Sequence, residues 1–421
     1  MAPNVENFNL SLLAGKVFTP GSAIDAKELF AGRIKQIRRI VDTVAQTGQH
    51  AVLYGEPGVG KTSLANVCSD FFSGIESSVL APKINCVTTD TFSTLWKKVF
   101  NEIELSTTTQ GVGFTNQDTR KSYVLSAKLP DIIRPDHVMT ALSDVARKHL
   151  LVVIIDEFDR IAQDDVRREM ADTIKMLSDY QTKATILLVG VADSVNELIR
   201  EHHSIERALM QIHMPRMTKD ELEEIIQNGL DKLKMSADRN TLNEIVSLAK
   251  GLPYFVHLLG LHASRKALDA NQKRITTSHL EGAIKEALDG AQQTMRTAYH
   301  RATKSVRKGT IHKHVLLACS LAKTDEFGYF NASAVASPLS IIRDKKYEVP
   351  YFAQHLRDFS DESRGKILQQ TGEPYNKLYR FKNPMMQPFI IMNGLSDQLV
   401  TPKVLQQFGQ ITISDDLSSG F

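Results

Sequence analysis

One nine-residue stretch, Gly55-Glu-Pro-Gly-Val-Gly-Lys-Thr-Ser63, constrains the fold more than any other part of the chain. The apolar run before it, HAVLY, predicts a buried strand, and TSLANVCSDFF predicts the helix that follows. Glycines in such a turn let consecutive backbone N–H groups converge on phosphate oxygens, because no side chains intervene. The helix N-terminus adds the positive end of its dipole. The sequence therefore predicts an α/β fold with a phosphate site between strand and helix.

The stretch fits G-x-x-x-x-G-K-[ST], the pattern of a nucleotide-binding loop. We expect Lys61 to reach the β and γ phosphates of a nucleotide and the Thr62 hydroxyl to bind Mg²⁺. The alternative is a glycine-rich turn with an incidental lysine, which the flanking strand and helix disfavour. The predicted phosphate contacts are Gly55, Glu56, Pro57, Gly58, Val59, Gly60, Lys61, Thr62 and Ser63.

A second motif supplies the acidic groups that nucleotide hydrolysis needs. The apolar run from Leu150 to Ile155 predicts a strand buried on both faces of a parallel sheet, and it ends in Asp156 and Glu157. We expect Asp156 to bind Mg²⁺ and Glu157 to polarise the attacking water. Asp159 is better explained as a helix cap or an ion-pair partner.

A third strand, Ile186 to Gly190, runs into Asp193 and Ser194 and then a helix. Its end should lie beside Asp156, where a polar side chain can sense the γ-phosphate or the attacking water. Asp193 is the preferred candidate over Ser194. Both residues are also favoured helix N-caps, and the two roles are compatible.

The composition favours a cytoplasmic protein of two or three domains. The chain has 421 residues, 42% hydrophobic, with a net charge of +3, so its charge does not indicate a nucleic-acid binder. The three cysteines are widely spaced and predict reduced thiols, without a disulfide framework or a zinc site. The N-terminus lacks signal-peptide character, and no apolar run is long enough for a transmembrane helix.

The nucleotide-binding loop, the Asp-Glu pair and the polar third strand together resemble the AAA+ ATPases. ELFAGRIKQIRRIVDTVAQTGQHAVLYGEPGVGKTSL is similar to the entry segment of the replication-initiation (origin-recognition-like) branch. By that resemblance, Phe30, Gly32 and Arg33 lie near the adenine. The resemblance implies ATP and Mg²⁺ as cofactors and an ATPase activity.

AAA+ rings also use an arginine that reaches the γ-phosphate of a neighbouring subunit. The resemblance places this role on Arg207, in HHSIERALMQIHMPRM, and makes Arg216 the second candidate. Arg207 is equally compatible with a surface ion pair. Such an arginine, called an arginine finger, acts between subunits and therefore implies an ATP-dependent homo-oligomer.

The lid departs from the replication-initiation pattern. LAKGLPYFVHLLG has no arginine at the start of its helix, and Gly251-Leu252-Pro253 instead resembles the STAND branch of signalling ATPases. That resemblance packs Pro253 on the nucleotide. Without the arginine, we expect lid packing to read the nucleotide state and turnover to be slow. His257, one turn along, is better explained as a core histidine than as a phosphate ligand.

The remaining patterns predict an α/β parallel-sheet AAA+ core with a helical lid and a C-terminal winged helix. A capping box, Thr218 to Glu221, opens the lid. Residues 105–135 are expected to be a loop-rich insertion, a surface loop in preference to a segment that lines a central channel, as such insertions can in AAA+ proteins. In the third domain a wing hairpin is expected from Gly365–Leu368 and Leu378–Phe381. The predicted boundaries are 1–24 extension, 25–216 core, 217–290 lid, 291–395 winged helix and 396–421 tail.

DNA binding by the winged helix is left open by the sequence. The segment from Lys304 to Asn383 has 14 lysines and arginines against 8 acids, but its recognition helix, VPYFAQHLRDFS, has few groups able to read bases. Arg364, Lys366, Lys377 and Arg380 are the candidate phosphate contacts.

Two functions follow from these patterns. In the first, nucleotide state controls oligomerisation and engagement of an effector protein, with a bacterial defence or stress system as one setting. In the second, the chain loads or remodels proteins on DNA. A third interpretation, binding without hydrolysis, is disfavoured by the intact Asp156–Glu157 pair.

Overall fold

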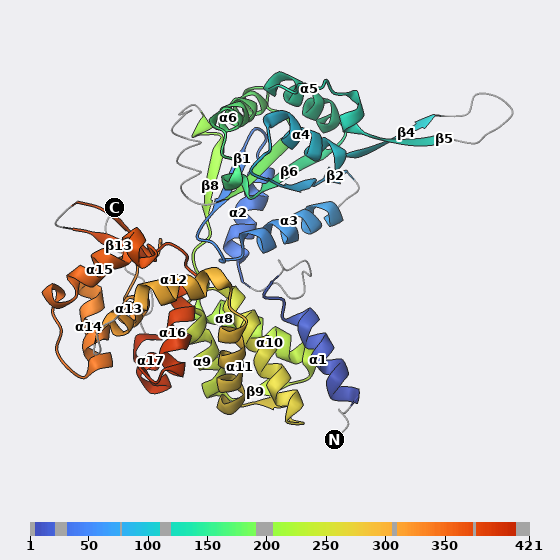
Figure 1. Ribbon diagram of the computed structural model, residues 1–421. Coiled ribbons are helices and arrows are strands. Elements are labelled where there is room, and N and C mark those ends of the chain that lie inside the picture. Colours follow the sequence, from blue (N-terminus) through green and yellow to red (C-terminus); the bar gives the residue numbers. More distant parts are fainter. Residues whose placement is uncertain are drawn as a thin grey trace, which may run out of the picture. The chain divides into compact units, whose positions relative to one another are not determined.

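The computed structural model describes residues 5–21, 32–75, 78–109, 119–190, 205–304, 310–373 and 376–409 (Figure 1). Contacts within the chain divide it into two units. The sheet unit consists of residues 23–55 and 61–214, and the helical unit of residues 1–22, 56–60 and 215–421. The glycine-rich loop therefore belongs by its contacts to the helical unit, although the sheet unit supplies the chain on both sides of it.

The sheet unit contains a parallel sheet in the order β8-β1-β7-β6, with β2 and β3 both pairing with the free side of β6. The strands are β1 His50–Tyr54, β2 Val79–Leu80, β3 Lys83–Asn85, β6 Leu150–Asp156, β7 Ala184–Gly190 and β8 Leu209–His213. Because the strands run parallel, the carboxyl ends of β1, β6 and β7 lie at one edge. The three motif-bearing strands predicted from the sequence are thus neighbours.

Helices cover both faces of this sheet, as the continuous apolar runs of β6 and β7 require (Figure 1). One side carries α4 Phe92–Asn101, α5 Pro135–Ala146 and α6 Asp164–Asp179, and the other α2 Ile34–Val44 and α3 Lys61–Ile75. Trp96 and Phe100 of α4 are fully buried in the core between α4, α5, α6 and the sheet. This packing positions the strands that end at the carboxyl edge of the sheet.

The segment expected to be a surface loop forms an antiparallel ribbon instead. Strands β4, Glu104–Thr109, and β5, Thr119–Val124, pair along their full length, and a short 3-10 turn, η2 Leu125–Lys128, follows. The sequence prediction was wrong here because runs of threonine and serine satisfy strand geometry without the apolar alternation that marks a half-buried strand.

In the helical unit, the lid consists of α8 Lys219–Leu233, α9 Arg239–Ala249, α10 Pro253–Asp269 and α11 Thr277–Asp289. A short parallel pair, β9 Ser236–Ala237 with β10 Arg274–Ile275, closes its far end. The predicted capping box is confirmed, since Thr218 accepts from Glu221 N–H and Glu221 accepts from Thr218 N–H. Helix α1, Val5–Val17, packs on α8 and α10.

The residue that follows α1 in this packing is Phe18, which is 1% exposed. Its ring lies against Gly229 of α8 and Gly260 of α10, where a side chain on either glycine would overlap it. We expect Phe18→Ala to lower the free energy of unfolding by about 3–5 kcal/mol, because it leaves a cavity between three helices. Phe8→Ala, on α1 but 57% exposed, should cost less than about 1 kcal/mol. Urea unfolding measures both variants. Equal losses of unfolding free energy would contradict the conclusion that Phe18 is a core residue of this packing.

The C-terminal part forms the predicted winged helix. Helix α12 Gln293–Thr303 leads into it, and its elements are α13 His312–Leu321, β11 Phe330–Asn331, α14 Ala332–Arg343, η5 Val349–Tyr351, α15 Ala353–Phe359, η6 Glu362–Arg364, β12 Leu368–Thr371, β13 Leu378–Phe381 and α16 Met386–Ser396. Helix α17, Pro402–Gly409, follows in the part predicted to be a tail. The first wing strand begins three residues later than predicted, because Gly365 (φ 79°) and Lys366 (φ 43°) adopt left-handed backbone. The expected recognition helix is divided into η5 and a seven-residue α15.

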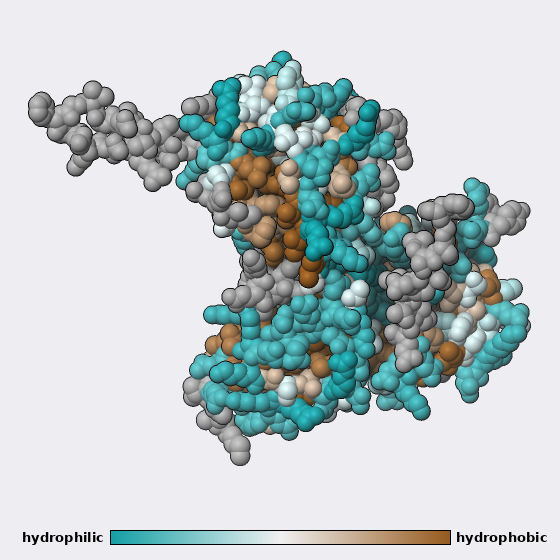
Figure 2. Space-filling view, turned by 180° about the vertical axis from the view of Figure 1, so that it is seen from behind, coloured by the Kyte–Doolittle hydropathy of each residue, from teal (hydrophilic) through white to brown (hydrophobic). Residues whose placement is uncertain are grey.

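Over the lid, the face drawn in Figure 2 is mostly hydrophilic, with hydrophobic residues in small separate groups. Within the described residues, no helix is both long and apolar enough to cross a membrane. The three cysteines, Cys68, Cys86 and Cys319, are buried free thiols.

Candidate functional site

The glycine-rich loop has the backbone that its sequence predicts. Gly58 (φ 85°) and Gly60 (φ 95°) are both left-handed, which a residue with a Cβ rarely adopts, and α3 begins at Lys61. At the start of the loop, a Cβ on Gly55 would overlap the Met214 carbonyl oxygen. The loop is therefore specified by glycine at these three positions.

Lys61 and Thr62 lie in the first turn of α3, where N–H groups point out of the helix. The Lys61 ammonium donates to the Gly55 carbonyl at 3.0 Å. Both side chains are half-buried, and α3 packs against β6, the strand that ends in Asp156. These positions suit the predicted contacts with phosphate and Mg²⁺.

Asp156, at the end of β6, is 1% exposed. Its Oδ1 accepts the Glu157 backbone N–H at 2.8 Å, and Lys83 Nζ lies 3.5 Å from Oδ2. Among the described residues, no hydrogen bond reaches Oδ2. A buried carboxylate oxygen without a hydrogen bond, at a strand end, fits a hard divalent cation such as Mg²⁺. The Thr62 hydroxyl is the second expected ligand.

Glu157 follows with left-handed backbone (φ 56°, ψ 35°), which turns the chain sharply at the strand end. Its Oε2 accepts from Arg160 Nη1 at 2.8 Å, and the two side chains are 42% and 50% exposed. An ion pair this exposed contributes little to stability. The Glu157 carboxylate is thus accessible to water at the edge of the sheet.

Three other predicted site residues lie outside the residues that the structure describes, namely Asp193, Ser194 and Phe30, so their roles stay predictions. Gly32 (φ 69°) and Arg33 (φ 62°) immediately precede α2, and the Arg33 side chain is 2% exposed.

Within the helical unit, the Gly-Leu-Pro stretch contacts the glycine-rich loop. Helix α10 begins at Pro253, whose Cγ lies 3.8 Å from the position a Cβ would take on Gly60. Leu252 Cδ2 lies 3.9 Å from the same position on Gly58. The apolar start of the lid helix therefore packs on the loop that is expected to hold the phosphates.

Arg216 has a role that the sequence did not predict. Its Nε donates to Glu56 Oε2 at 2.6 Å and its Nη2 to Glu56 Oε1 at 3.3 Å, a two-point contact with the glycine-rich loop. Nη1 donates to the Lys250 carbonyl, next to the Gly-Leu-Pro stretch, at 3.2 Å, and to Gln387 Oε1 of α16 at 2.5 Å. Gln387 in turn donates to the Ser320 carbonyl of α13 at 2.8 Å.

This Arg216 junction, formed by Glu56, Arg216, Lys250 and Gln387, joins loop, lid and winged helix. The Arg216 and Glu56 side chains are only 20% and 12% exposed. Gly328 completes it, because a Cβ there would overlap Glu56. One sequence signal could have indicated this junction. Glu56, at the second position of the loop, is an acid that needs a cationic partner when it is buried.

Arg207, the first candidate for a finger, lies in the turn directly before β8 and is exposed. Its backbone carbonyl accepts from Gln49 Nε2 at 3.2 Å, which fixes the main chain. The Arg207 side chain is therefore placed at the surface, as a residue acting on a neighbouring subunit requires.

Two histidines are buried without charge. Burial lowers the pKa of His50, which accepts the Ile186 N–H at 3.0 Å, to about 4. His257 packs edge-on against Phe18 and is 5% exposed, and burial lowers its pKa to about 4 as well. The structure places His257 in the core, as the sequence favoured.

These histidines predict a loss of stability in acid. An unfolded histidine takes up a proton near pH 6.5, whereas the folded groups stay neutral down to about pH 4. Their contribution to the free energy of unfolding is complete above pH 6.5. It is lost as the pH falls toward 4, by about 1.4 kcal/mol per pH unit for each histidine. We expect His257→Leu to reduce the slope of the unfolding free energy against pH by the part that His257 contributes. Urea unfolding at several pH values measures this slope. An unchanged slope would contradict it.

The comparisons with known proteins agree with this architecture. The Aeropyrum pernix ORC2 protein in its ADPNP–ADP complexes matches with a TM-score of 0.51 and 15% identity, over 94% of this chain and 97% of that one. The Walker-type ATPase PABY2304 of Pyrococcus abyssi matches with a TM-score of 0.50 and 15% identity, over 89% and 99%. At this identity the similarity establishes the fold alone. The predicted AAA+ fold class is confirmed.

A search of curated proteins finds no significant match to this sequence. The family model described as Novel STAND NTPase 1 matches residues 23–326, which is more than half of the chain. The match includes the glycine-rich loop, the Asp156–Glu157 pair and the lid. The chain therefore belongs to the novel STAND NTPase 1 family.

Proposed function

We propose that the protein is an ATP-driven switch, in which the nucleotide held by the glycine-rich loop determines whether the chain assembles and engages an effector protein. The Arg216 junction carries this proposal. It connects a residue of the loop to the lid and to the winged helix through hydrogen bonds of 2.5–3.3 Å. A ligand that displaces Glu56 therefore alters the contact between the loop and the winged helix.

Hydrolysis in this proposal is an in-line attack of water on the γ-phosphate. Thr62 and Asp156 would hold Mg²⁺, which would supply positive charge to neutralise the phosphates. Lys61 leaves the Gly55 carbonyl to bind the β and γ phosphates, and Glu157 accepts the proton of the attacking water. Asp193 has the proposed role of sensing the γ-phosphate. Arg33 and Gly32 border the base, for which adenine is proposed, and Pro253 packs on the nucleotide.

The effect of nucleotide on the junction follows from electrostatics. A triphosphate adds several negative charges next to Glu56, so the Arg216 guanidinium is drawn toward the nucleotide and away from Gln387. The winged helix then loses one charge-assisted hydrogen bond to the rest of the unit. Release of this domain exposes surface for assembly, and Arg207 of one subunit completes the site of the next.

Loading or remodelling of proteins on DNA is the second candidate, favoured by the basic balance of the winged helix. Three of its four proposed phosphate contacts already have partners within the domain. Arg364 donates to the Lys304 carbonyl, Lys366 pairs with Glu362 at 3.0 Å, and Arg380 lies over the Tyr329 ring at 4.7 Å. The switch is therefore the better supported of the two.

The test is light scattering after size exclusion, with Mg²⁺ and either ADP or ATP, with and without duplex DNA. We expect wild type with ADP to be monomeric and Glu157→Gln with ATP to form oligomers without DNA. Gln387→Met removes the acceptor for Arg216, so it should assemble at about 10- to 100-fold lower ATP concentration. Gln370→Met, an exposed residue of the same domain, is the control.

Monomers under every condition would overturn the switch. Assembly only with DNA would favour the second candidate. An ATP threshold for Gln387→Met equal to that of the control would remove the Arg216 junction from the mechanism while leaving ATP-dependent assembly standing.

A further inference from the structure

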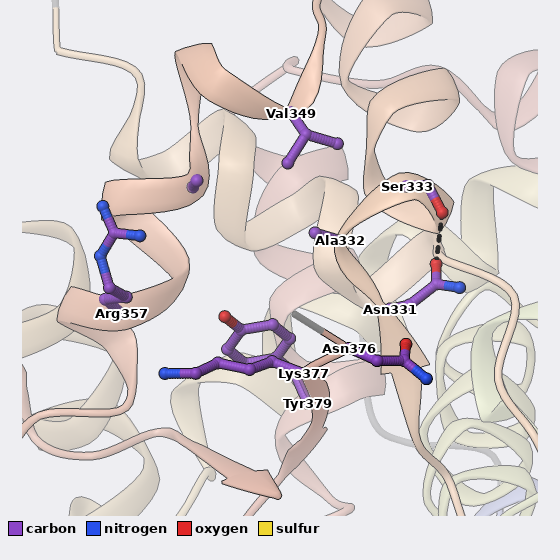
Figure 3. A pocket seen from close by; sticks show the side chains of 9 residues that line it. Asn331, Ala332, Ser333, Val349, Arg357, Asn376, Lys377 and Tyr379 are labelled. Atoms are coloured by element: carbon purple, nitrogen blue, oxygen red, sulfur yellow. Dashed lines mark hydrogen bonds between the residues drawn. The ribbon is translucent and has the colours of Figure 1, made fainter. Parts of the chain in front are cut away.

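The winged helix contains a cavity of about 350 Å³ that the nucleotide site does not use (Figure 3). It lies between the start of α14, the segment η5–α15 and strand β13. Nine residues line it: Asn331, Ala332, Ser333, Val349, Ala353, Arg357, Asn376, Lys377 and Tyr379. The lining contains two cations and no acid, so its chemistry favours an anion.

Tyr379 is the first sign that the cavity is built for a ligand. The residue is 5% exposed, yet its hydroxyl lines the cavity and makes no hydrogen bond with any residue that the structure describes. Burial raises the pKa of this phenol, and the Arg357 charge acts in the opposite direction. The hydroxyl therefore stays protonated and is a donor at neutral pH. The ring is buried while the hydroxyl faces the open cavity, where the acceptor oxygen of a ligand can take the place of water.

The two cations are arranged around the same space. Gln354 Oε1, on the same helix α15, accepts from Arg357 Nε at 3.1 Å and from Nη2 at 2.7 Å. Gln354 also donates to Asp358, the nearest acid on that helix, at 2.7 Å. In Figure 3 the Tyr379 hydroxyl and the Lys377 ammonium point toward the side of the cavity on which Arg357 lies.

The opposite side is the N-terminus of α14, a twelve-residue helix. Asn331 caps it by accepting the Ala334 N–H at 2.9 Å, and Ser333 Oγ donates to the same Asn331 oxygen at 2.7 Å. The cap leaves the N–H groups of Ala332 and Ser333 at the positive end of the helix dipole, beside the cavity. Cations on one side and helix N–H groups on the other are a combination that binds phosphate.

We propose that this pocket, the α14 pocket, binds a phosphate group through Arg357, Lys377, the Tyr379 hydroxyl and the start of α14. Its volume suits a phosphate ester of small-molecule size. A phosphomonoester metabolite and a backbone phosphate of DNA present the same chemistry, and the experiment separates them. The site is distinct from the glycine-rich loop and does not depend on the proposed switch.

The experiment is isothermal titration of the full chain carrying Lys61→Ala, so that the glycine-rich loop contributes little. The probes are inorganic phosphate, ribose 5-phosphate and a DNA duplex of about 15 base pairs. In this background, Arg357→Gln and Lys377→Gln should each weaken binding about tenfold or more. Tyr379→Phe, which removes only the hydroxyl, should weaken it about three- to tenfold. Lys345→Gln, an exposed lysine of the same domain, should change nothing.

Tighter binding of ribose 5-phosphate than of DNA assigns the pocket to a small ligand. Tighter binding of DNA, lost in the same three variants, assigns it to the backbone, and both results support a phosphate site. Equal affinities in the pocket variants and Lys345→Gln would overturn it, as would absence of binding up to about 20 mM phosphate. Circular dichroism of each variant confirms that it is folded, and Tyr379→Phe keeps the ring that packs against Phe330.

Discussion

Glu157→Gln is expected to reduce nucleotide hydrolysis by about 10²- to 10⁴-fold while nucleotide binding is kept, because the amide cannot accept a proton from water. The change is isosteric, and the pair it breaks with Arg160 is half-exposed, so stability should change little. Phosphate release under saturating ATP measures turnover, and equilibrium titration with a fluorescent ATP analogue measures binding.

Asp159→Asn is the matched control for this prediction. Asp159 lies two residues further along in the short helical turn Phe158–Arg160, and the substitution makes the same carboxylate-to-amide change. It should leave turnover within about threefold of wild type. If Asp159→Asn lost as much activity as Glu157→Gln, the base would be misassigned. If Glu157→Gln stayed active, catalysis would have to come from another residue.

Arg216→Ala should lower the free energy of unfolding by about 2–4 kcal/mol, because it leaves the Glu56 carboxylate, 12% exposed, without its guanidinium. Gln387 and the Lys250 carbonyl lose a donor at the same time. The same substitution should raise basal assembly, since the winged helix loses its link to the glycine-rich loop. Urea unfolding and light scattering of the nucleotide-free protein measure the two effects.

The lid offers a matched control with the same chemistry and different burial. Arg239 pairs with Glu223 at 2.9 Å, but its side chain is 66% exposed. Arg239→Ala should cost at most about 1 kcal/mol, because solvent already screens the pair. A double-mutant cycle with Glu56→Gln then isolates the coupling in the Arg216 junction. Equal losses for the two arginines would show that Arg216 is an ordinary surface residue.

The strands and the loop of the site were predictable because their signals are local. A glycine at positive φ, a lysine in the first helical turn and a carboxylate after a buried strand are each specified by neighbouring residues. The predicted strands around Gly55 and Asp156 match β1 and β6 within one residue. The wing strand predicted at residues 365–368 was placed wrongly, since left-handed backbone at Lys366, which is not a glycine, has no clear sequence signature.

The sequence by itself thus determined the fold class, the nucleotide-binding loop and the acidic pair, because each is encoded in a short run of the chain. Tertiary structure alone decided the Arg216 junction and the α14 pocket. Glu56 and Arg216 are 160 residues apart, and Arg216 and Gln387 are 171 apart. Such contacts depend on how packing brings distant segments together, and a buried polar group takes whichever partner that packing supplies.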